Sequence, residues 1–446
     1  MPVTPYPTVF FPIEISTREY PGHLLLATEL ADRGFVSVIG HKGPVGRLMR
    51  FYDAPAVLFY KGDLREVYAH KNIAVGQDPE AGIVFDDFEE FYVRRPFSLQ
   101  RLDTSKAYFC YGPDDHEFLT GRHSELADKI YPTGSPRVEL WGPAGARFFD
   151  RQVEEIRVRY GEFVLIASSG GRGNPIALKE LQQDRNGPNA ERIREKLATD
   201  ERRARLLATC ARRITDDPGV NVVVRPHPAE SWKRWKKDAA SIPRLYVDSA
   251  YDLNAWVRAA AVVIQNSSTT AFEAWFAGTP VIAYGESSGD ILGGDAQGRT
   301  PNRIALPVTG EEDLVETLAN VEARWDRHRS KQEPRNVIER KVYPPGSGSV
   351  QAIADVLVDL VQGAPPPVIP RLGYEQRVRS FAAGLWERRA GRERLGRRRP
   401  PPTKRWPLTV DRVGRDVEAA SEILGLKRAV AVKRVAPSAF VVGGPL

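Results

Sequence analysis

The sequence is poor in cysteine and contains no long hydrophobic run. Only Cys110 and Cys210 occur among 446 residues, far apart and without a metal-ligand spacing nearby. This excludes a disulfide framework, and because the seven histidines also lack zinc spacing, we expect no structural zinc site. No apolar stretch approaches the roughly 20 residues that span a bilayer. Residues 1–5 lack the basic and apolar regions of a signal peptide, so a cytoplasmic protein is expected.

The net positive charge of the chain comes from one segment. The formal charge is +7, but residues 371–405 contain twelve Lys or Arg and three Glu, a net +9. The rest of the chain therefore sums to −2, which argues against a nucleic-acid partner. Residues 375–395 have the pattern of a basic amphipathic helix with Trp386 on its apolar face. Such a helix suits an anionic membrane surface, and the alternative is a helix docked on the body with a solvated basic face.

The first half of the chain alternates strand and helix patterns, which predicts a doubly wound parallel sheet. A helix is expected from about residue 22 to 33, with Gly34 just past its end. Short apolar runs rich in β-branched and aromatic residues indicate the strands. The expected strands are residues 9–15, 35–39, 56–60, 82–85 and 107–111.

The second half repeats this alternation, so the fold class is α/β with two Rossmann-like domains that face a cleft. A long charged helix is expected at residues 190–214. The expected strands are residues 162–167, 221–224, 261–264 and 279–284. The predicted domains are residues 1–155, residues 156–362, and a basic Pro/Arg-rich extension at 363–446. A last helix, residues 349–361, is expected to cross back to the first half.

A His-Pro loop follows one strand of the second half. Arg225, Pro226, His227 and Pro228 come directly after the apolar run 221–224. The prolines restrict the backbone of this loop, so the imidazole is held in place. It can then donate a hydrogen bond to a phosphate or pair with it as a cation. The alternative is a histidine that only satisfies nearby carbonyl groups.

A run of hydroxyls follows the next expected strand and opens a helix. Its members are Ser267, Ser268, Thr269 and Thr270. Hydroxyls and free backbone N–H groups at a helix start form a phosphate site, whereas an N-cap alone needs only one of these side chains. Glu273, one turn into the helix, can accept hydrogen bonds from a ribose or serve as a capping-box carboxylate.

Three weaker candidates complete the site. Gly171 and Arg172 lie in a glycine-rich loop after residues 162–167, where the backbone can approach a phosphate, although no Walker A pattern follows. Clustered carboxylates at a strand end can supply a base or nucleophile, and Asp86 and Asp87 follow the expected strand 82–85. Glu19 lies near the start of the first helix. These carboxylates also fit an ordinary solvated loop, and no Asp-x-Asp pair suggests a metal ion.

In its His-Pro loop and its Ser/Thr-rich loop that opens a helix with a Glu, the chain resembles bacterial GT-B glycosyltransferases that use cytidine-nucleotide donors. These include the sialic-acid, polysialic-acid and Kdo transferases. It resembles the bacterial surface carbohydrate biosynthesis proteins more closely. The matching segments are Phe11-Pro12-Ile13-Glu14-Ile15 with Arg18-Glu19, Gly134-Ser135-Pro136-Arg137, and Asn266-Ser267-Ser268-Thr269-Thr270 with Glu273-Ala274. The resemblance implies a GT-B fold with residues 1–155 as the acceptor-side domain and residues 156–362 as the nucleotide-donor domain. The second domain would hold CMP, with His227 and the four hydroxyls at its phosphate. It also implies an acidic group in the first domain, but the family's acidic pair is often followed by glycine, whereas Phe88 follows Asp87 here.

The resulting hypothesis is a glycosyltransferase of surface polysaccharide or capsule synthesis, peripheral at the inner face of the plasma membrane. It would transfer Kdo or a nonulosonate from a CMP-sugar donor to a glycan or lipid-linked acceptor, with no metal and no other cofactor. The catalytic carboxylate would be Asp86, Asp87 or Glu19. Two alternatives stay open: a CDP-glycerol-type glycerophosphotransferase with His23 as base, and a non-catalytic nucleotide-binding GT-B scaffold.

Overall fold

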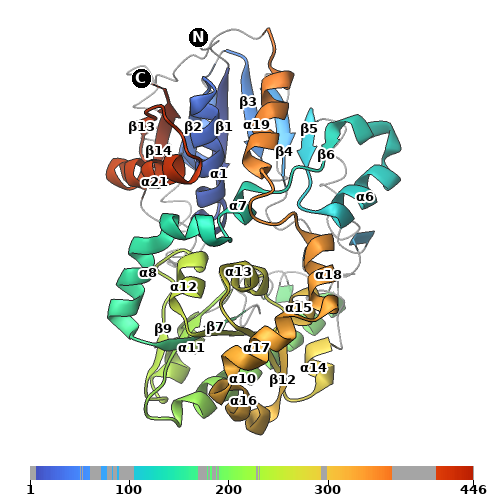
Figure 1. Ribbon diagram of the computed structural model, residues 1–446, viewed down its shortest axis with the longest axis vertical. Coiled ribbons are helices and arrows are strands. Elements are labelled where there is room, and N and C mark those ends of the chain that lie inside the picture. Colours follow the sequence, from blue (N-terminus) through green and yellow to red (C-terminus); the bar gives the residue numbers. More distant parts are fainter. Residues whose placement is uncertain are drawn as a thin grey trace. The chain divides into compact units, whose positions relative to one another are not determined.

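Two β-sheets organise the chain, one in each of two units (Figure 1). Unit 1 comprises Met1–Ala81, Phe91–Phe148 and Val342–Leu446, and unit 2 comprises Gly82–Glu90 and Phe149–Lys341. The computed structural model describes residues 7–50, 52, 54–60, 72–77, 83, 88–89, 105–168, 178, 181–182, 187, 190–227, 230, 232–292, 299–363 and 408–444.

The sheet of unit 2 has six strands, all parallel, in the order β12-β11-β10-β7-β8-β9. The central strands are buried along nearly their whole length, because their apolar runs are covered on both faces. The strands are β7 (Phe163–Ala167), β8 (Asn221–Arg225), β9 (Leu245–Val247), β10 (Val262–Gln265), β11 (Val281–Gly285) and β12 (Leu306–Thr309). The strands expected in the second half are confirmed. Strands β9 and β12 were not predicted from the sequence.

One face of this sheet forms a continuous core with α10, α11 and α16. Alternate residues of neighbouring strands point to this face, such as Val164 and Ile166 of β7, and they pack against Leu207 of α10, Trp235 of α11 and other buried side chains. The helices of this unit are α8 (Ala146–Tyr160), α10 (Ala190–Thr215), α11 (Trp232–Ala239), α12 (Leu253–Ala259), α13 (Thr270–Ala277), α14 (Ser288–Leu292), α15 (Arg299–Ile304), α16 (Gly310–Ala319), α17 (Val321–Arg329) and α18 (Gln332–Lys341).

The strand order fixes where loops of unit 2 converge. Strands β8 and β9 extend the sheet on one side of β7, and the chain then returns to place β10 on the other side. This is the Rossmann order, and in such sheets ligands bind beside the carboxyl ends of the strands where the order reverses. In unit 2 these are the ends of β7 and β10, which lead to Ser168 and to the segment after Gln265.

The sheet of unit 1 has the order β13-β14-β2-β1-β3-β4-β5-β6, and its strands from β2 to β6 are parallel. They are β1 (Thr8–Ile13), β2 (Val36–His41), β3 (Ala56–Tyr60), β4 (Asn72–Gly76), β5 (Ala107–Phe109) and β6 (Ile130–Tyr131). The helices are α1 (Ser16–Asp32), α2 (Lys42–Arg50), α6 (Pro113–Arg122), α7 (Pro136–Glu139), α19 (Ser349–Leu360) and α21 (Val410–Ile423), with two short 3-10 turns at Ser124–Lys129 and Pro143–Gly145.

Two expectations for the first half of the chain need correction. Helix α1 begins at Ser16, six residues before the expected start, although Gly34 ends it with φ +98° as predicted. The expected strand at residues 82–85 is not supported, because Ile83, its one described residue, lies in a turn. The strand beside β3 is instead β4, whose short segment Asn72–Gly76 has a weak apolar pattern.

The C-terminal residues belong to unit 1 rather than to a separate extension. Strand β14 (Ala439–Gly443) pairs antiparallel with β2, and β13 (Ala431–Ala436) pairs with β14 at the sheet edge. Helix α21 is tied to α1 by a 2.8 Å hydrogen bond from Tyr20 Oη to Asp416 Oδ2. Burial raises the pKa of Asp416, with Arg412 acting against that shift. The predicted extension at 363–446 therefore fails for its described part, residues 408–444. Helix α19 also groups with unit 1, as the predicted crossing back requires.

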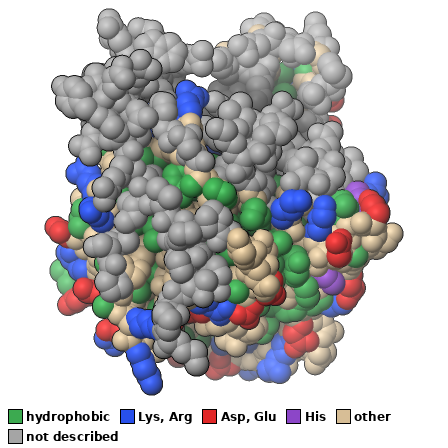
Figure 2. All heavy atoms as spheres, turned by 90° about the horizontal axis from the view of Figure 1, so that it is seen from above, with side chains coloured by type: hydrophobic (Ala, Val, Ile, Leu, Met, Phe, Trp, Pro, Cys, Tyr) green, Lys and Arg blue, Asp and Glu red, His purple; other side chains and the backbone are tan. Residues whose placement is uncertain are grey.

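Charged side chains of both signs are interspersed over the described part of the face in Figure 2. This agrees with a body whose net charge is small apart from residues 371–405. That basic segment lies outside the described residues. Within the described ranges, no helix is both long and apolar enough to cross a bilayer.

Candidate functional site

Three strand ends meet in unit 2. Strands β7, β8 and β10 are neighbours in the sheet, and Ser168, Pro226 and Asn266 follow them directly. The Ser168 N–H donates to the Arg225 carbonyl over 3.2 Å, so the chain segments leaving β7 and β8 stay side by side. The structure therefore brings the two predicted phosphate loops to one edge of one sheet.

His227 lies in the turn that leaves β8. Its ring is half-buried, and its carbonyl accepts a hydrogen bond from the Glu230 N–H over 2.8 Å, which closes the turn. Arg225, the last residue of β8, is buried. Its contact with a phosphate stays a prediction. Pro228, Gly171 and Arg172 lie outside the described residues.

The four predicted hydroxyls divide into two pairs. Ser268 and Thr270 are buried and bond each other, with 2.9 Å between Oγ and Oγ1. Ser268 Oγ also accepts from the Thr270 N–H over 3.3 Å, as a capping residue does. Ser267 and Thr269 are half-exposed. The hydroxyls available to a ligand are therefore those of Ser267 and Thr269.

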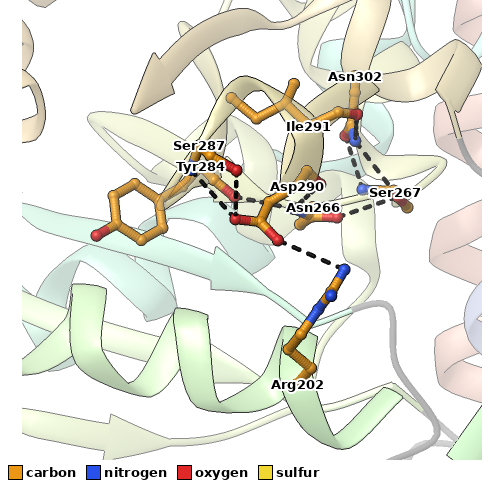
Figure 3. A network of polar contacts seen from close by, with 8 residues as sticks. All are labelled: Arg202, Asn266, Ser267, Tyr284, Ser287, Asp290, Ile291 and Asn302. Atoms are coloured by element: carbon orange, nitrogen blue, oxygen red, sulfur yellow. Dashed lines mark hydrogen bonds and ion pairs between the residues drawn. The ribbon is translucent and has the colours of Figure 1, made fainter. Parts of the chain in front are cut away.

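Ser267 adopts a left-handed backbone conformation, with φ +64°. This conformation costs a non-glycine residue about 1–2 kcal/mol, so the surroundings must impose it. Asn302 of α15 does so (Figure 3): its Oδ1 accepts from the Ser267 N–H over 2.7 Å, and its Nδ2 donates to Ser267 Oγ over 3.3 Å. Asn302 Nδ2 also donates to the Ile291 carbonyl over 2.7 Å. The hydroxyl of Ser267 is thus held in one orientation.

Asn266 anchors the same loop from its other side. Its Nδ2 donates to the carbonyls of Tyr284 and Asp290, over 2.9 and 3.1 Å, and its Oδ1 accepts from Ser267 Oγ over 3.1 Å. The Asp290 side chain in turn pairs with Arg202 of α10, with 3.4 Å between Nη2 and Oδ1 (Figure 3). The loop is therefore fastened to β11, α14 and α10. Nothing in the sequence marked Asn302, which lies 35 positions after Ser267.

The prediction of free backbone N–H groups at this helix start is largely wrong. The Ser267 N–H is taken by Asn302, and the Ser268 N–H donates to Gln265 Oε1 over 2.7 Å. The Thr270 N–H is taken by Ser268 Oγ. Side-chain amides and a hydroxyl thus consume these donors, which leaves side-chain hydroxyls as the main groups for a ligand.

Glu273 points into the protein rather than toward a ligand. It is 2% exposed, and its Oε2 accepts from Asn254 Nδ2 of α12 at 3.5 Å. Asn254 Oδ1 in turn accepts from Arg258 Nε over 2.6 Å. Burial lowers the pKa of Arg258, and the Glu273 charge opposes that shift. The carboxylate therefore holds α12 beside α13, and its position gives no support to the ribose contact.

A buried carboxyl that sequence reasoning missed lies beside the His227 turn. Glu230 is 5% exposed, and its Oε1 accepts from Ser168 Oγ over 2.6 Å. Its Oε2 accepts from the indole Nε1 of Trp235 over 2.9 Å. Burial raises the pKa of Glu230 to about 8, although its hydrogen bonds with Ser168, Trp235 and the His227 backbone act against the shift. A glutamate three positions after the histidine was the available signal, but a single glutamate in a loop is common.

In unit 1, Glu19 supports the fold at the end of β1. It is 3% exposed, its Oε2 accepts from the Glu14 N–H over 2.7 Å, and Arg18 Nη2 lies 4.0 Å from its Oε1. The carboxylate thus holds the turn between β1 and α1. Asp86 and Asp87 lie outside the described residues. His23 is half-buried between Phe11 and Phe59, with ring centroids 5.5 and 5.3 Å away.

The Gly-Ser-Pro-Arg motif is a structural joint of unit 1. Gly134 has φ +76°, and a Cβ there would lie 2.4 Å from Ser349 Oγ, so only glycine fits. Ser135 Oγ donates to Gln77 Oε1 over 2.9 Å and accepts from the Arg137 N–H at the start of α7. The motif therefore joins the end of β4 to α7 and α19.

The two hydrogen bonds between Asn302 and Ser267, here called the Ser267 clamp, give a first testable prediction. In the Asn302→Ala variant, buried partners of the amide lose their hydrogen bonds, so unfolding should be easier by about 1–3 kcal/mol, and nucleotide affinity should fall because Ser267 relaxes. Ser267→Gly suits the left-handed backbone, so it should retain the melting temperature while losing affinity. Scanning calorimetry and nucleotide titration measure both effects, with the exposed Asn336→Ala as control. An Asn302→Ala variant that binds and melts like the wild type would contradict the clamp.

No family model matches this chain, and no curated protein matches it in sequence. Its fold is nevertheless similar to solved structures. Wall teichoic acid polymerase TagF matches with TM-score 0.51 and 11% identity, over 81% of this chain and 90% of that chain. The same polymerase soaked with CDPG gives TM-score 0.51, 10% identity and the same coverage. A putative UDP-N-acetylglucosamine 2-epimerase from Listeria monocytogenes gives TM-score 0.50 and 13% identity, over 81% of this chain and 98% of that chain. These likenesses show the fold: it is a GT-B fold of two Rossmann-like domains, as predicted.

Proposed function

We propose that the chain is a GT-B glycosyltransferase of cell-surface polysaccharide assembly with a CMP-activated donor. The proposed sugar is Kdo or a nonulosonate, and the acceptor is a glycan or lipid-linked glycan. One observation carries the proposal: Ser267, a half-exposed residue, is fixed in a left-handed conformation at the end of the sheet that also bears His227. Strain of this kind, imposed by two buried asparagines, is typical of a ligand-binding loop. The GT-B fold and the motif resemblance supply the class of ligand.

The chemistry proposed for this site is direct glycosyl transfer. The acceptor hydroxyl oxygen bonds to the anomeric carbon, while the bond from that carbon to the phosphate oxygen breaks and CMP leaves with the electron pair. His227 and the Thr269 hydroxyl would stabilise the charge on the departing phosphate. The Ser267 hydroxyl would join them by shifting its hydrogen bond from Asn266 Oδ1 to the phosphate. The hydroxyl proton would pass to Asp86 or Asp87, since Glu19 is already committed to the turn after β1. We propose that these groups make a metal ion unnecessary.

A CDP-glycerol-dependent glycerophosphotransferase is the second candidate. The fold likeness to wall teichoic acid polymerase TagF favours it. In that reaction the acceptor hydroxyl oxygen would bond to the phosphorus that carries glycerol, while the bond from that phosphorus to CMP breaks and CMP leaves. Glycerol phosphate would thus be transferred, and His23 would be the base in unit 1 that takes the hydroxyl proton. The third candidate is a GT-B scaffold that binds nucleotide without turnover.

Donor turnover separates the three candidates. The purified protein is incubated with CMP-Kdo, CMP-sialic acid or CDP-glycerol, with and without EDTA, and the products are identified by mass. We expect slow CMP release to water from a CMP-sugar, with free sugar as the second product and no effect of EDTA. Glycerol phosphate as the second product would establish the CDP-glycerol alternative. If the protein binds nucleotide but releases CMP from none of the donors, the non-catalytic GT-B scaffold is the remaining candidate.

The basic residues 371–405 have a proposed role in the same account. Because they lie outside the described residues, the proposal rests on their charge and on the apolar face predicted for residues 375–395. Such a segment would hold the enzyme at an anionic membrane surface, close to a lipid-linked acceptor.

A further inference from the structure

Glu230 joins three parts of unit 2 around the proposed donor site. Its backbone N–H closes the His227 turn over 2.8 Å, and its carboxyl contacts Ser168 at the end of β7 and Trp235 of α11. Trp235 is fully buried in the core between α11 and the sheet. The carboxyl group therefore connects the histidine turn to the strand where the sheet order reverses and to a rigid part of the core.

Among the described residues, no contact places a cation beside the Glu230 carboxyl. Asp200 of α10 is buried and acts on Glu230 as a like charge, although Lys196 pairs with Asp200 at 2.9 Å. Its hydrogen-bond partners are neutral: the Ser168 hydroxyl, the Trp235 indole and the His227 backbone. Burial without a compensating cation disfavours the charged form of a carboxyl group. The 2.6 Å contact to Ser168 Oγ suits a protonated carboxyl as well as an ionised one.

We propose that Glu230 is a positioning residue that acts as a neutral carboxylic acid, holding the His227 turn against the end of β7, and that its ionisation weakens donor binding. This inference rests on the proposed function, because it concerns the same phosphate site. A negative charge that appears behind the His227 turn repels the donor phosphate and also strains the buried contacts with Ser168 and Trp235. The site would then favour donor below about pH 8 and lose it above, as the Glu230 pKa of about 8 indicates.

Titration with CMP between pH 7.5 and 9.5 tests the proposal, because the nucleotide phosphate is already fully ionised over that range. Wild-type affinity should fall on the order of tenfold as pH rises. Glu230→Gln should remove most of that fall, while the exposed Glu195→Gln should keep the wild-type profile. Trp235→Phe removes one hydrogen bond that favours the ionised form, so the midpoint of the fall should move to higher pH.

Thermal unfolding provides a second readout that does not depend on nucleotide. The folded chain binds the Glu230 proton more tightly than the unfolded chain, in which its ordinary value is 4.5. Stability should therefore decline as pH rises from about 4.5 through 8, and Glu230→Gln should decline less.

The outcomes separate this inference from the function on which it rests. A Glu230→Gln variant whose affinity falls with pH as steeply as the wild type would overturn the positioning role, as would an equal loss of affinity at every pH. If the wild type binds CMP at no pH, the proposed donor is wrong and the donor part of the inference fails with it. The unfolding profile then still decides whether Glu230 is neutral at pH 7, and identical profiles for the wild type and Glu230→Gln would refute that.

Discussion

Replacing His227 with alanine is expected to lower the affinity for cytidine nucleotides about 10- to 150-fold while leaving the melting temperature nearly unchanged. A hydrogen bond to a charged phosphate contributes about 1.5–3 kcal/mol, which gives this range of affinity. Stability should change little because the ring is half-buried in a turn and lies outside the apolar core of unit 2. Isothermal titration and scanning calorimetry on the same preparations measure both quantities.

Two further variants define what His227 contributes. His227→Asn retains an N–H donor without the ability to carry a positive charge, so it should keep part of the affinity if hydrogen bonding dominates. His116→Ala removes another half-buried histidine, on α6 of unit 1, and should change neither affinity nor melting temperature. A large loss of stability in His227→Ala, with the remaining folded protein still binding nucleotide, would support a purely structural histidine.

Ending the chain after Gly363 is expected to prevent unit 1 from folding. Strand β14 lies inside the sheet between β13 and β2, and Phe440, Val441 and Val442 are fully buried. Burial of each such side chain contributes about 1.5–3 kcal/mol, so the three together match much of the stability of a typical domain. Loss of β14 also leaves β2 as an unpaired edge, which promotes aggregation. Solubility, near-UV circular dichroism and thermal unfolding measure the effect.

Controls for this truncation come from the same hairpin. A chain that ends after Gly444 keeps β14 whole and should melt like the wild type. Val441→Ser changes a fully buried core position, whereas Lys433→Ser changes an exposed position on β13. The first should destabilise the protein strongly, and the second should change little. A soluble chain ending at Gly363 with the wild-type melting temperature would show that the C-terminal residues are dispensable for the fold.

Local sequence patterns predicted the parallel strands and the loops that follow them. Buried strands such as β7 and β10 are continuous apolar runs, so their position is readable without a structure. Their order in the sheet then places His227 and Ser267 at one edge. The glycine that ends α1 was also readable, since Gly34 has a positive φ.

Long-range pairing was beyond this reasoning. Strand β14 pairs with β2 although some 400 residues separate them, and no pattern in the basic C-terminal sequence indicates that partner. Strand β4 is short and only weakly apolar, so the sequence pattern favours the more apolar stretch at 82–85. Both errors arise because tertiary contacts, rather than local propensity, decide which short segments become strands.

The direction of polar side chains was equally out of reach. Four consecutive hydroxyls look equivalent in the sequence, but the helix start turns Ser268 and Thr270 inward and leaves Ser267 and Thr269 half-exposed. Glu273 and Glu19 are buried because neighbouring elements supply donors to their carboxylates. Asn302 and Glu230 acquire their roles only when α15 and β7 are placed beside the loops.

Binding of CMP, CDP, UDP and GDP to the wild-type chain, measured side by side by isothermal titration calorimetry, tests the central claim most directly. We expect the cytidine nucleotides to bind and UDP and GDP to bind at least tenfold more weakly. Ser267→Gly should weaken cytidine binding without unfolding the protein. Binding of UDP in the absence of CMP binding would contradict the proposed donor.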